Sequence, residues 1–214
     1  MTDFASLRAS MVERQLRRRG ISDERVLEAM GAVPREEFVS ARYRSRAYSD
    51  SALPIDESQT ISQPWIVAAI AQALALRGGE RVLEVGTGSG YSAAVLAQLG
   101  AAVISVERHP ALAEEAQELL RRLGYDVEVI VGDGSRGVPE RAPFEAIAVH
   151  AAAPAAPRAL LDQLADGGRL VVPVATDGAD MLTVHRRRGE AIESETIGPC
   201  RFVPLLGAEG FAPS

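Results

Sequence analysis

The sequence predicts an α/β fold in which helices cover both faces of a doubly wound, mostly parallel β-sheet. Segments typical of buried strands alternate with segments typical of helices from residue 80 to residue 174. A glycine-rich turn joins the first of these strands to the next helix, a feature of open sheets that bind ligands at their strand ends. The chain has 214 residues, of which 47% are hydrophobic, so it is long enough for one sizeable core.

Residues 1–79 are expected to form a helical region interrupted by one long loop. Apolar residues recur at helical spacing in three stretches. The second stretch has Ser22 as a candidate N-cap, and the third begins with Pro64, which suits a first helical turn. Periodicity is poor between these two stretches, so an irregular loop is predicted inside the domain. The expected helices are residues 4–19, 23–30 and 64–77, and the expected loop is residues 34–64.

Residues 80–214 are expected to form the sheet and the helices that cover it. Alternation of strand and helix implies right-handed crossovers between parallel strands, and the last two strands are predicted to form an antiparallel edge. We find no linker or internal repeat, so residues 1–214 are predicted to form a single domain. The expected strands are residues 81–85, 103–106, 127–131, 146–149, 170–174, 182–185 and 201–205, and the expected helices are residues 91–99, 111–123 and 158–164.

Charge and cysteine content restrict the partners and the compartment. The chain has 29 acidic residues and 23 basic residues, all of them arginine, so its formal net charge is −6. This balance argues against binding of nucleic acid or anionic membrane through bulk charge, and the lack of lysine excludes Schiff-base chemistry. Cys200 is the single cysteine, and we find neither a signal-peptide pattern nor a long apolar run. We therefore expect a cytoplasmic protein, monomeric and without a metal site.

The glycine-rich turn after the first strand points to a particular cofactor. Gly86, Gly88 and Gly90 form a G-x-G-x-G pattern, which differs from the G-x-G-x-x-G of nicotinamide and flavin binders. Glycines let the backbone turn tightly and let a ligand approach the strand end. Glu84 precedes the turn, and its carboxylate would favour the charged amino group of S-adenosylmethionine but repel a pyrophosphate.

Two later strand ends add hydrogen-bond acceptors. Glu107 stands 21 residues after Gly86, where a carboxylate can accept hydrogen bonds from both ribose hydroxyls. The run Gly132-Asp133-Gly134 follows the third strand, and it places the Asp133 side chain where an adenine amino group would lie. Because parallel strands present their carboxyl ends at one edge, we predict that these segments together bind S-adenosyl-L-methionine. The predicted binding residues of this half are Glu84, Gly86, Gly88, Gly90, Glu107, Asp133 and Gly134.

The region after the fourth strand argues against methylation of nucleic-acid bases. Enzymes that methylate exocyclic amino groups have Asn or Asp followed by Pro-Pro-Tyr or Pro-Pro-Phe there, whereas this chain has His150-Ala151-Ala152-Ala153-Pro154. Methylation at cytosine C5 needs a thiolate nucleophile. Cys200 lies far from this region in the sequence, and free cysteine is usually a small buried hydrophobe. We interpret His150 as a polar residue at the rim of the site.

The loop before the third helix has the most distinctive motif, Ser58-Gln59-Thr60-Ile61-Ser62-Gln63-Pro64-Trp65. With this motif the chain resembles the protein-L-isoaspartate O-methyltransferase family, because it repeats the family signature Gln-Thr-Ile-Ser-Gln-Pro in full. The resemblance extends over most of the chain and implies a Rossmann-like, S-adenosylmethionine-dependent methyltransferase fold. The further matching segments are residues 82–90, 132–134, 151–154, 163–164, 167–170 and 201–205.

The resemblance implies repair of damaged proteins. A methyl group passes from S-adenosyl-L-methionine to the α-carboxylate of an isoaspartyl residue in a peptide or protein, and S-adenosyl-L-homocysteine is released. The resemblance also implies that Ser62 holds the acceptor carboxylate and that Gln59, Thr60, Ile61 and Trp65 line the methionine end of the cofactor. A carboxylate with a pKa of about 4 is already anionic at neutral pH, so no general base is required.

One segment departs from the family pattern. Many members have Gly-x-Gly before the signature, whereas this chain has Asp56-Glu57-Ser58. The lost glycines restrict the loop backbone, and two carboxylates would repel an acidic acceptor. Two alternatives therefore stay open: a homologue that methylates carboxylates of a dedicated peptide partner, and an inactive cofactor-binding scaffold. Ser62 could also serve as a helix N-cap, and Trp65 could be a packing residue.

Overall fold

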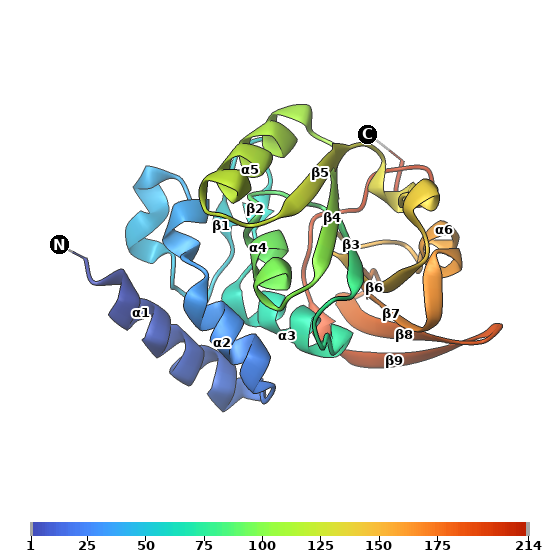
Figure 1. The fold of residues 1–214 in the computed structure, drawn as a ribbon, viewed down its shortest axis with the longest axis horizontal. Coiled ribbons are helices and arrows are strands. Elements are labelled where there is room, and N and C mark those ends of the chain that lie inside the picture. Colours follow the sequence, from blue (N-terminus) through green and yellow to red (C-terminus); the bar gives the residue numbers. More distant parts are fainter. Residues whose placement is uncertain (1, 213–214) are drawn as a thin grey trace.

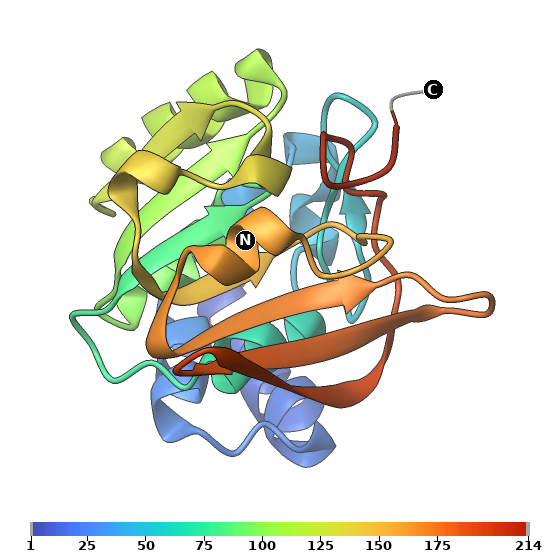
Figure 2. The same cartoon turned by 90° about the vertical axis from the view of Figure 1, so that its right-hand side faces the viewer.

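The computed structural model describes residues 2–212 and contains one seven-stranded sheet with helices on both faces (Figures 1 and 2). The strand order is β5-β4-β3-β6-β7-β8-β9. The first five strands in this order pair in parallel, and β8 runs antiparallel to both of its neighbours. The predicted mostly parallel sheet with an antiparallel edge is thus confirmed. The strands are β3 (Arg81–Val85), β4 (Ala102–Glu107), β5 (Val127–Val131), β6 (Phe144–Val149), β7 (Leu164–Val174), β8 (Asp180–Arg188) and β9 (Ala191–Cys200).

Two apolar clusters, one on each face, hold the helices against the sheet. Side chains alternate between faces along a strand, so Val82 belongs to one cluster and Leu83 to the other. The larger cluster includes the N-terminal helices, α3, α4 and part of α5, and the smaller one includes α6. These helices are α3 (Pro64–Leu74), α4 (Tyr91–Gln98), α5 (Pro110–Arg122) and α6 (Arg158–Asp162). None of the helices within residues 2–212 is long and apolar enough to cross a bilayer.

The N-terminal helices pack against α3 and α4 (Figure 1). The first helical stretch starts as α1 (Phe4–Met11), continues through a π turn and a 3₁₀ turn, and ends at Gly20 with φ = 93°. The second helix is α2 (Glu24–Ala32). Its N-cap is Asp23, whose carboxylate accepts a hydrogen bond from an amide of the first turn, so the expected cap at Ser22 is wrong. The Ser22 amide instead donates to the Gln72 side chain.

The expected loop over residues 34–64 has more structure than its sequence indicates. It contains two 3₁₀ turns, Arg35–Phe38 and Ala41–Arg46, followed by a short antiparallel hairpin of β1 (Leu53–Pro54) and β2 (Thr60–Ile61). Such short elements leave no hydrophobic period in the sequence. The signature motif therefore runs from Gln59, just before β2, to Pro64, the first residue of α3.

The edge of the sheet also differs from its prediction. The last strand is β9, and residues 201–205 are not an edge strand as predicted. They run beside the segment that follows β6, where the Ala152 amide donates to the Val203 carbonyl at 2.8 Å and the Leu205 amide donates to the Ala152 carbonyl at 2.7 Å. Because β9 is exposed along most of its length, it shows no apolar alternation that sequence analysis could detect.

Candidate active site

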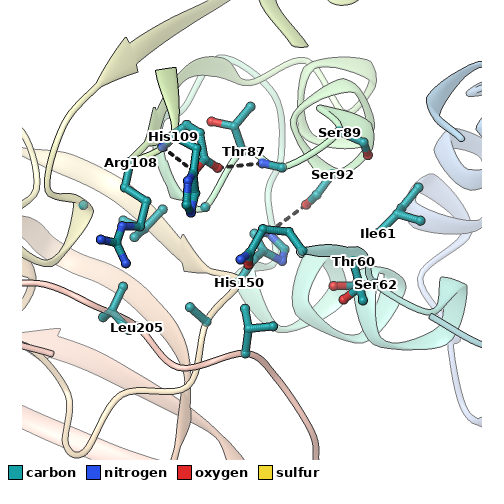
Figure 3. Close-up of a pocket in the computed structure, with 18 of the residues that line it drawn as sticks. Thr60, Ile61, Ser62, Thr87, Ser89, Ser92, Arg108, His109, His150 and Leu205 are labelled. Atoms are coloured by element: carbon teal, nitrogen blue, oxygen red, sulfur yellow. Dashed lines mark hydrogen bonds between the residues drawn. The ribbon is translucent and has the colours of Figure 1, made fainter. Parts of the chain in front are cut away.

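A cavity of about 260 Å³ opens at the carboxyl ends of β3, β4 and β6 (Figure 3). Ligands bind at this edge in open α/β sheets. The cavity walls come from the hairpin, the glycine-rich turn, the segment after β4 and the C-terminal segment that pairs with Ala152. The main lining stretches are residues 58–62, 85–89, 106–109 and 203–206.

The cavity brings together eight of the twelve residues predicted from the sequence. They come from the hairpin, the glycine-rich turn and two further strand ends. Four others, Trp65, Glu84, Gly90 and Asp133, do not line the cavity. The residues on its wall are Gln59, Thr60, Ile61, Ser62, Gly86, Gly88, Glu107 and Gly134.

The glycine-rich turn needs glycine for two different reasons. Gly86, Gly88 and Gly90 have φ values of 92°, 52° and 84°, a region that side chains disfavour. Gly86 and Gly88 face the cavity. A Cβ on Gly90 would instead lie 3.2 Å from Leu120 of α5, so this glycine permits close packing of two helices.

Glu107 is held in place by backbone amides. Its carboxylate is buried, with Oε2 accepting from the Gly88 amide at 2.9 Å and Oε1 accepting from the His109 amide at 3.0 Å. Each oxygen has a further lone pair available. The Glu107 carboxylate on the cavity wall can therefore accept two more hydrogen bonds, as the hydroxyls of a ribose require.

Glu84 lies behind the cavity wall in a buried polar chain. Its side chain is 0% exposed, and Oε2 accepts a hydrogen bond of 2.6 Å from the Ser105 hydroxyl, which in turn accepts one from Thr87. Oε1 lies 3.3 Å from His150 Nε2, and this contact is not an aligned hydrogen bond. His150 lines the cavity and also bonds the Ser92 hydroxyl at 2.8 Å (Figure 3).

The side chain of His150, which is only 6% exposed, is therefore part of the cavity wall rather than of its rim. It connects the buried carboxylate of Glu84 to the cavity, whereas the sequence analysis assigned Glu84 itself to the cofactor. Only the position of His150 directly after a strand end signals this role in the sequence.

Gly134 lies on the cavity wall, and Asp133 lies directly behind it. The Asp133 carboxylate accepts hydrogen bonds from the amide and hydroxyl of Ser135 and from the Ala208 amide of the C-terminal segment. Burial favours a higher pKa for this carboxyl, but these hydrogen bonds outweigh it and lower the pKa. A Cβ on Gly134 would lie 2.5 Å from Val85 Cγ1, so close packing at the cavity wall requires glycine there.

Ser62 lies directly between β2 and α3, on the cavity wall (Figure 3). The N-cap residue of α3 is Gln63, which forms no side-chain capping bond, so the alternative of Ser62 as the N-cap is wrong. In the described part of the chain the Ser62 hydroxyl has no hydrogen bond, while its carbonyl accepts one of 2.7 Å from Arg35. The hydroxyl is thus available to a ligand.

Trp65 packs against the N-terminal helical region. Its indole Nε1 donates to the Arg19 carbonyl at 3.2 Å, and the Arg19 guanidinium carbon lies 4.9 Å from the ring centroid. These contacts favour the packing interpretation over contact with a cofactor.

The departure at Asp56-Glu57-Ser58 has a visible consequence for the backbone. Glu57 and Ser58 have φ values of 55° and 56°, which cost side-chain-bearing residues roughly 1–2 kcal/mol each. The Glu57 carboxylate lies 3.5 Å from His109 Nδ1. This contact joins the hairpin loop to the segment after β4.

Cys200 is not part of the site. It is half-buried at the end of β9, and its thiol lies 3.5 Å from the Asp180 carbonyl. Burial, assisted by the charge of Asp180, raises the pKa of the thiol to about 11. The thiol is therefore neutral at physiological pH, which argues against a nucleophilic role.

Comparisons with known proteins bear on the chemistry of this cavity. The family model described as Protein-L-isoaspartate(D-aspartate) O-methyltransferase (PCMT) matches residues 7–210. A Protein-L-isoaspartate O-methyltransferase from Methylorubrum populi is 56% identical over 213 residues, which cover 99% of this chain and 100% of the relative. Another Protein-L-isoaspartate O-methyltransferase, from Koribacter versatilis, is 50% identical, and the alignment covers 100% of this chain and 97% of the relative.

A solved structure extends the similarity to the fold. The crystal structure from Plasmodium falciparum, described as a protein-L-isoaspartate O-methyltransferase in complex with S-adenosyl-L-homocysteine, has a TM-score of 0.81 and 27% identity. The alignment covers 93% of this chain and 98% of that one. The family expected from the signature motif is thus confirmed along nearly the whole sequence, and the chain belongs to the protein-L-isoaspartate(D-aspartate) O-methyltransferase family.

Proposed function

We propose that this methyltransferase transfers the methyl group of S-adenosyl-L-methionine to the α-carboxylate of isoaspartyl residues in damaged proteins. The observation that carries the proposal is the position of Ser62. Its hydroxyl, which has no hydrogen bond within residues 2–212, lies on the wall of the same cavity as the glycine-rich turn and Glu107. A donor for an acceptor carboxylate and a binding surface for a cofactor therefore share one cavity.

The residues present fit S-adenosyl-L-methionine. The Glu107 carboxylate would accept the ribose hydroxyls, and Gly86 and Gly88 would allow the cofactor to approach the end of β3. Gln59, Thr60 and Ile61 would lie along its methionine part. The bound cofactor supplies an electrophilic methyl group attached to a positively charged sulfur.

The chain itself has to orient the acceptor and exclude water. An isoaspartyl carboxylate is anionic at neutral pH, so no side chain has to remove a proton from it. The Ser62 hydroxyl would donate a hydrogen bond to one carboxylate oxygen and leave the other free to attack. Alignment of this kind contributes to rate by reducing the entropic cost of bringing two reactants together.

The remaining expectations form part of the same proposal. Glu84, Gly90, Asp133 and Trp65 would support the site from outside the cavity wall. The protein would be cytoplasmic and act as a single-domain monomer on isoaspartyl peptides and proteins, without nucleic acid or membrane as a partner. The acidic balance of the sequence supports the last point.

Two matched peptides test the proposal. One contains isoaspartate and the other aspartate at the same position, and methyl transfer from labelled S-adenosyl-L-methionine is measured for both. We expect transfer to the isoaspartyl peptide alone. Transfer to neither peptide, with S-adenosyl-L-homocysteine still bound in calorimetry, would contradict the proposal and favour an inactive scaffold or a dedicated peptide partner.

A further inference from the structure

Arg35 is a buried arginine for which the proposed reaction has no assigned role. It starts the 3₁₀ turn Arg35–Phe38, and its side chain is 0% exposed. Within residues 2–212, no carboxylate oxygen lies within 4.0 Å of its guanidinium nitrogens. Burial lowers the pKa of this group, because it removes the charge from water. Burying a cation without an ionic partner is costly, so its contacts need an explanation.

The guanidinium connects three segments of the chain. Its Nε donates to the Ala47 carbonyl at 2.8 Å, and one Nη donates to the Ser62 carbonyl at 2.7 Å. The guanidinium carbon lies 4.7 Å from the ring centroid of Tyr91. The second Nη is buried, and it has no hydrogen-bond partner among the residues that the structure describes.

Two of these three contacts involve the cavity. Ser62 and Tyr91 both line it, and Tyr91 is the first residue of α4, directly after the glycine-rich turn. Arg35 therefore lies behind the wall and joins the acceptor side of the cavity to the cofactor side.

The backbone at Ser62 needs such a contact. The strand β2 ends at Ile61 and α3 begins at Pro64, so Ser62 belongs to neither element. A planar guanidinium with two carbonyl bonds and a stacked ring restricts position more strongly than a single hydrogen bond does.

We infer that Arg35 is a positioning residue for methyl transfer: by holding the Ser62 carbonyl against the start of α4, it sets the distance between the Ser62 hydroxyl and the cofactor. The inference rests on the proposed function. It predicts that a change at Arg35 affects the acceptor more than the cofactor.

Arg35→Lys tests the inference, because lysine keeps the charge but cannot bond both carbonyls while stacking on the ring. Arg25→Lys is the matched control. Arg25 also donates to two backbone carbonyls, of Leu76 at 2.7 Å and Leu99 at 2.9 Å, at a place away from the cavity.

Steady-state kinetics and a binding measurement separate an effect on the acceptor peptide from an effect on cofactor binding. We expect Arg35→Lys to raise KM for the isoaspartyl peptide or lower kcat by at least about tenfold, the factor for one lost hydrogen bond to a charged donor. The Kd for S-adenosyl-L-homocysteine should stay within about twofold, and Arg25→Lys should leave both parameters unchanged. Unchanged peptide kinetics in a folded Arg35→Lys variant, or an equal loss of cofactor affinity, would overturn the inference.

Hydrogen exchange distinguishes this inference from the proposed function itself. Amides of residues 59–63 should exchange faster in Arg35→Lys than in Arg25→Lys, and this result does not depend on methyl transfer. Equal exchange in the two variants would overturn the inference even if the wild type is active. If Arg35→Lys does not fold, the same exchange and kinetic measurements apply to Arg35→Gln, which is neutral and keeps a donor for one carbonyl.

Discussion

Replacement of Ser62 by alanine isolates the contribution of one hydroxyl to methyl transfer. Since this hydroxyl forms no hydrogen bond in the described residues and α3 has its N-cap at Gln63, its removal breaks no hydrogen bond and no helix cap there. We therefore expect the free energy of unfolding to change by less than about 0.5 kcal/mol, as for surface substitutions.

The effect on catalysis should be much larger. A hydrogen bond to a charged group is worth about 1.5–3 kcal/mol, which corresponds to a loss of roughly 10- to 150-fold in kcat/KM for the isoaspartyl peptide. The Kd for S-adenosyl-L-homocysteine should remain within about twofold, because the proposed acceptor of the ribose hydroxyls is Glu107, on another segment of the cavity wall.

The assay combines methyl transfer to an isoaspartyl peptide with calorimetry of S-adenosyl-L-homocysteine and thermal unfolding. Ser58→Ala is the control, because it removes another hydroxyl from the same loop and the same cavity wall. If Ser62→Ala lost cofactor affinity as strongly as kcat/KM, or if Ser58→Ala lost equal activity, the assignment of Ser62 to the acceptor would be refuted.

Three further predictions concern the hairpin loop, the Asp133 carboxylate next to the cavity wall and the free thiol of Cys200. Glu57→Gly replaces a residue in the left-handed region by glycine and removes the contact of its carboxylate with His109, so urea unfolding should show equal or greater stability. It also removes a negative charge from the loop, so KM for the isoaspartyl peptide should fall. An unchanged KM would contradict repulsion of the acceptor by this carboxylate. Asp133→Asn should destabilise the protein at pH 7. Because hydrogen bonds such as that from Ala208 lower the pKa of Asp133, its stabilisation is present above roughly pH 4 and is lost as pH falls further. In urea unfolding, the difference in free energy of unfolding between the variant and the wild type should therefore be smaller at pH 3 than at pH 7. An equal difference at both pH values would be evidence against a stabilising role of the ionised Asp133 carboxylate. Cys200→Ser should retain full kcat/KM, and the wild-type thiol, with its pKa of about 11, should react slowly with iodoacetamide at pH 7.5; loss of activity in this variant would reopen a nucleophilic role.

The sequence alone predicted the parts of the molecule that depend on local pattern. The alternation of apolar strands and amphipathic helices is encoded within windows of roughly 4 to 18 residues, so the parallel sheet and the order of its elements along the chain were predictable. The glycine-rich turn was predictable because its backbone needs residues without a Cβ at Gly86 and Gly88. The signature motif from Gln59 to Pro64 likewise identified the family without any knowledge of the fold.

The tertiary structure decided which side chains reach the cavity. Glu84 and Asp133 follow the expected pattern in the sequence, but neither lines the cavity, because partners distant in sequence hold both carboxylates. Arg35 gave no signal, since its contacts with Ala47 and Ser62 arise only when the irregular segments fold against α4.

The same reason explains the errors at the edge of the sheet and in the hairpin. Strand β9 and the hairpin of β1 and β2 are stabilised by hydrogen bonds between backbones, and their side chains are largely exposed or too few to show a period. Local sequence therefore determined the scaffold and the glycine-rich turn. Long-range packing determined the proposed acceptor side, because Arg35 lies in a short turn and Ser62 directly after a hairpin, and the local sequence of both shows no period.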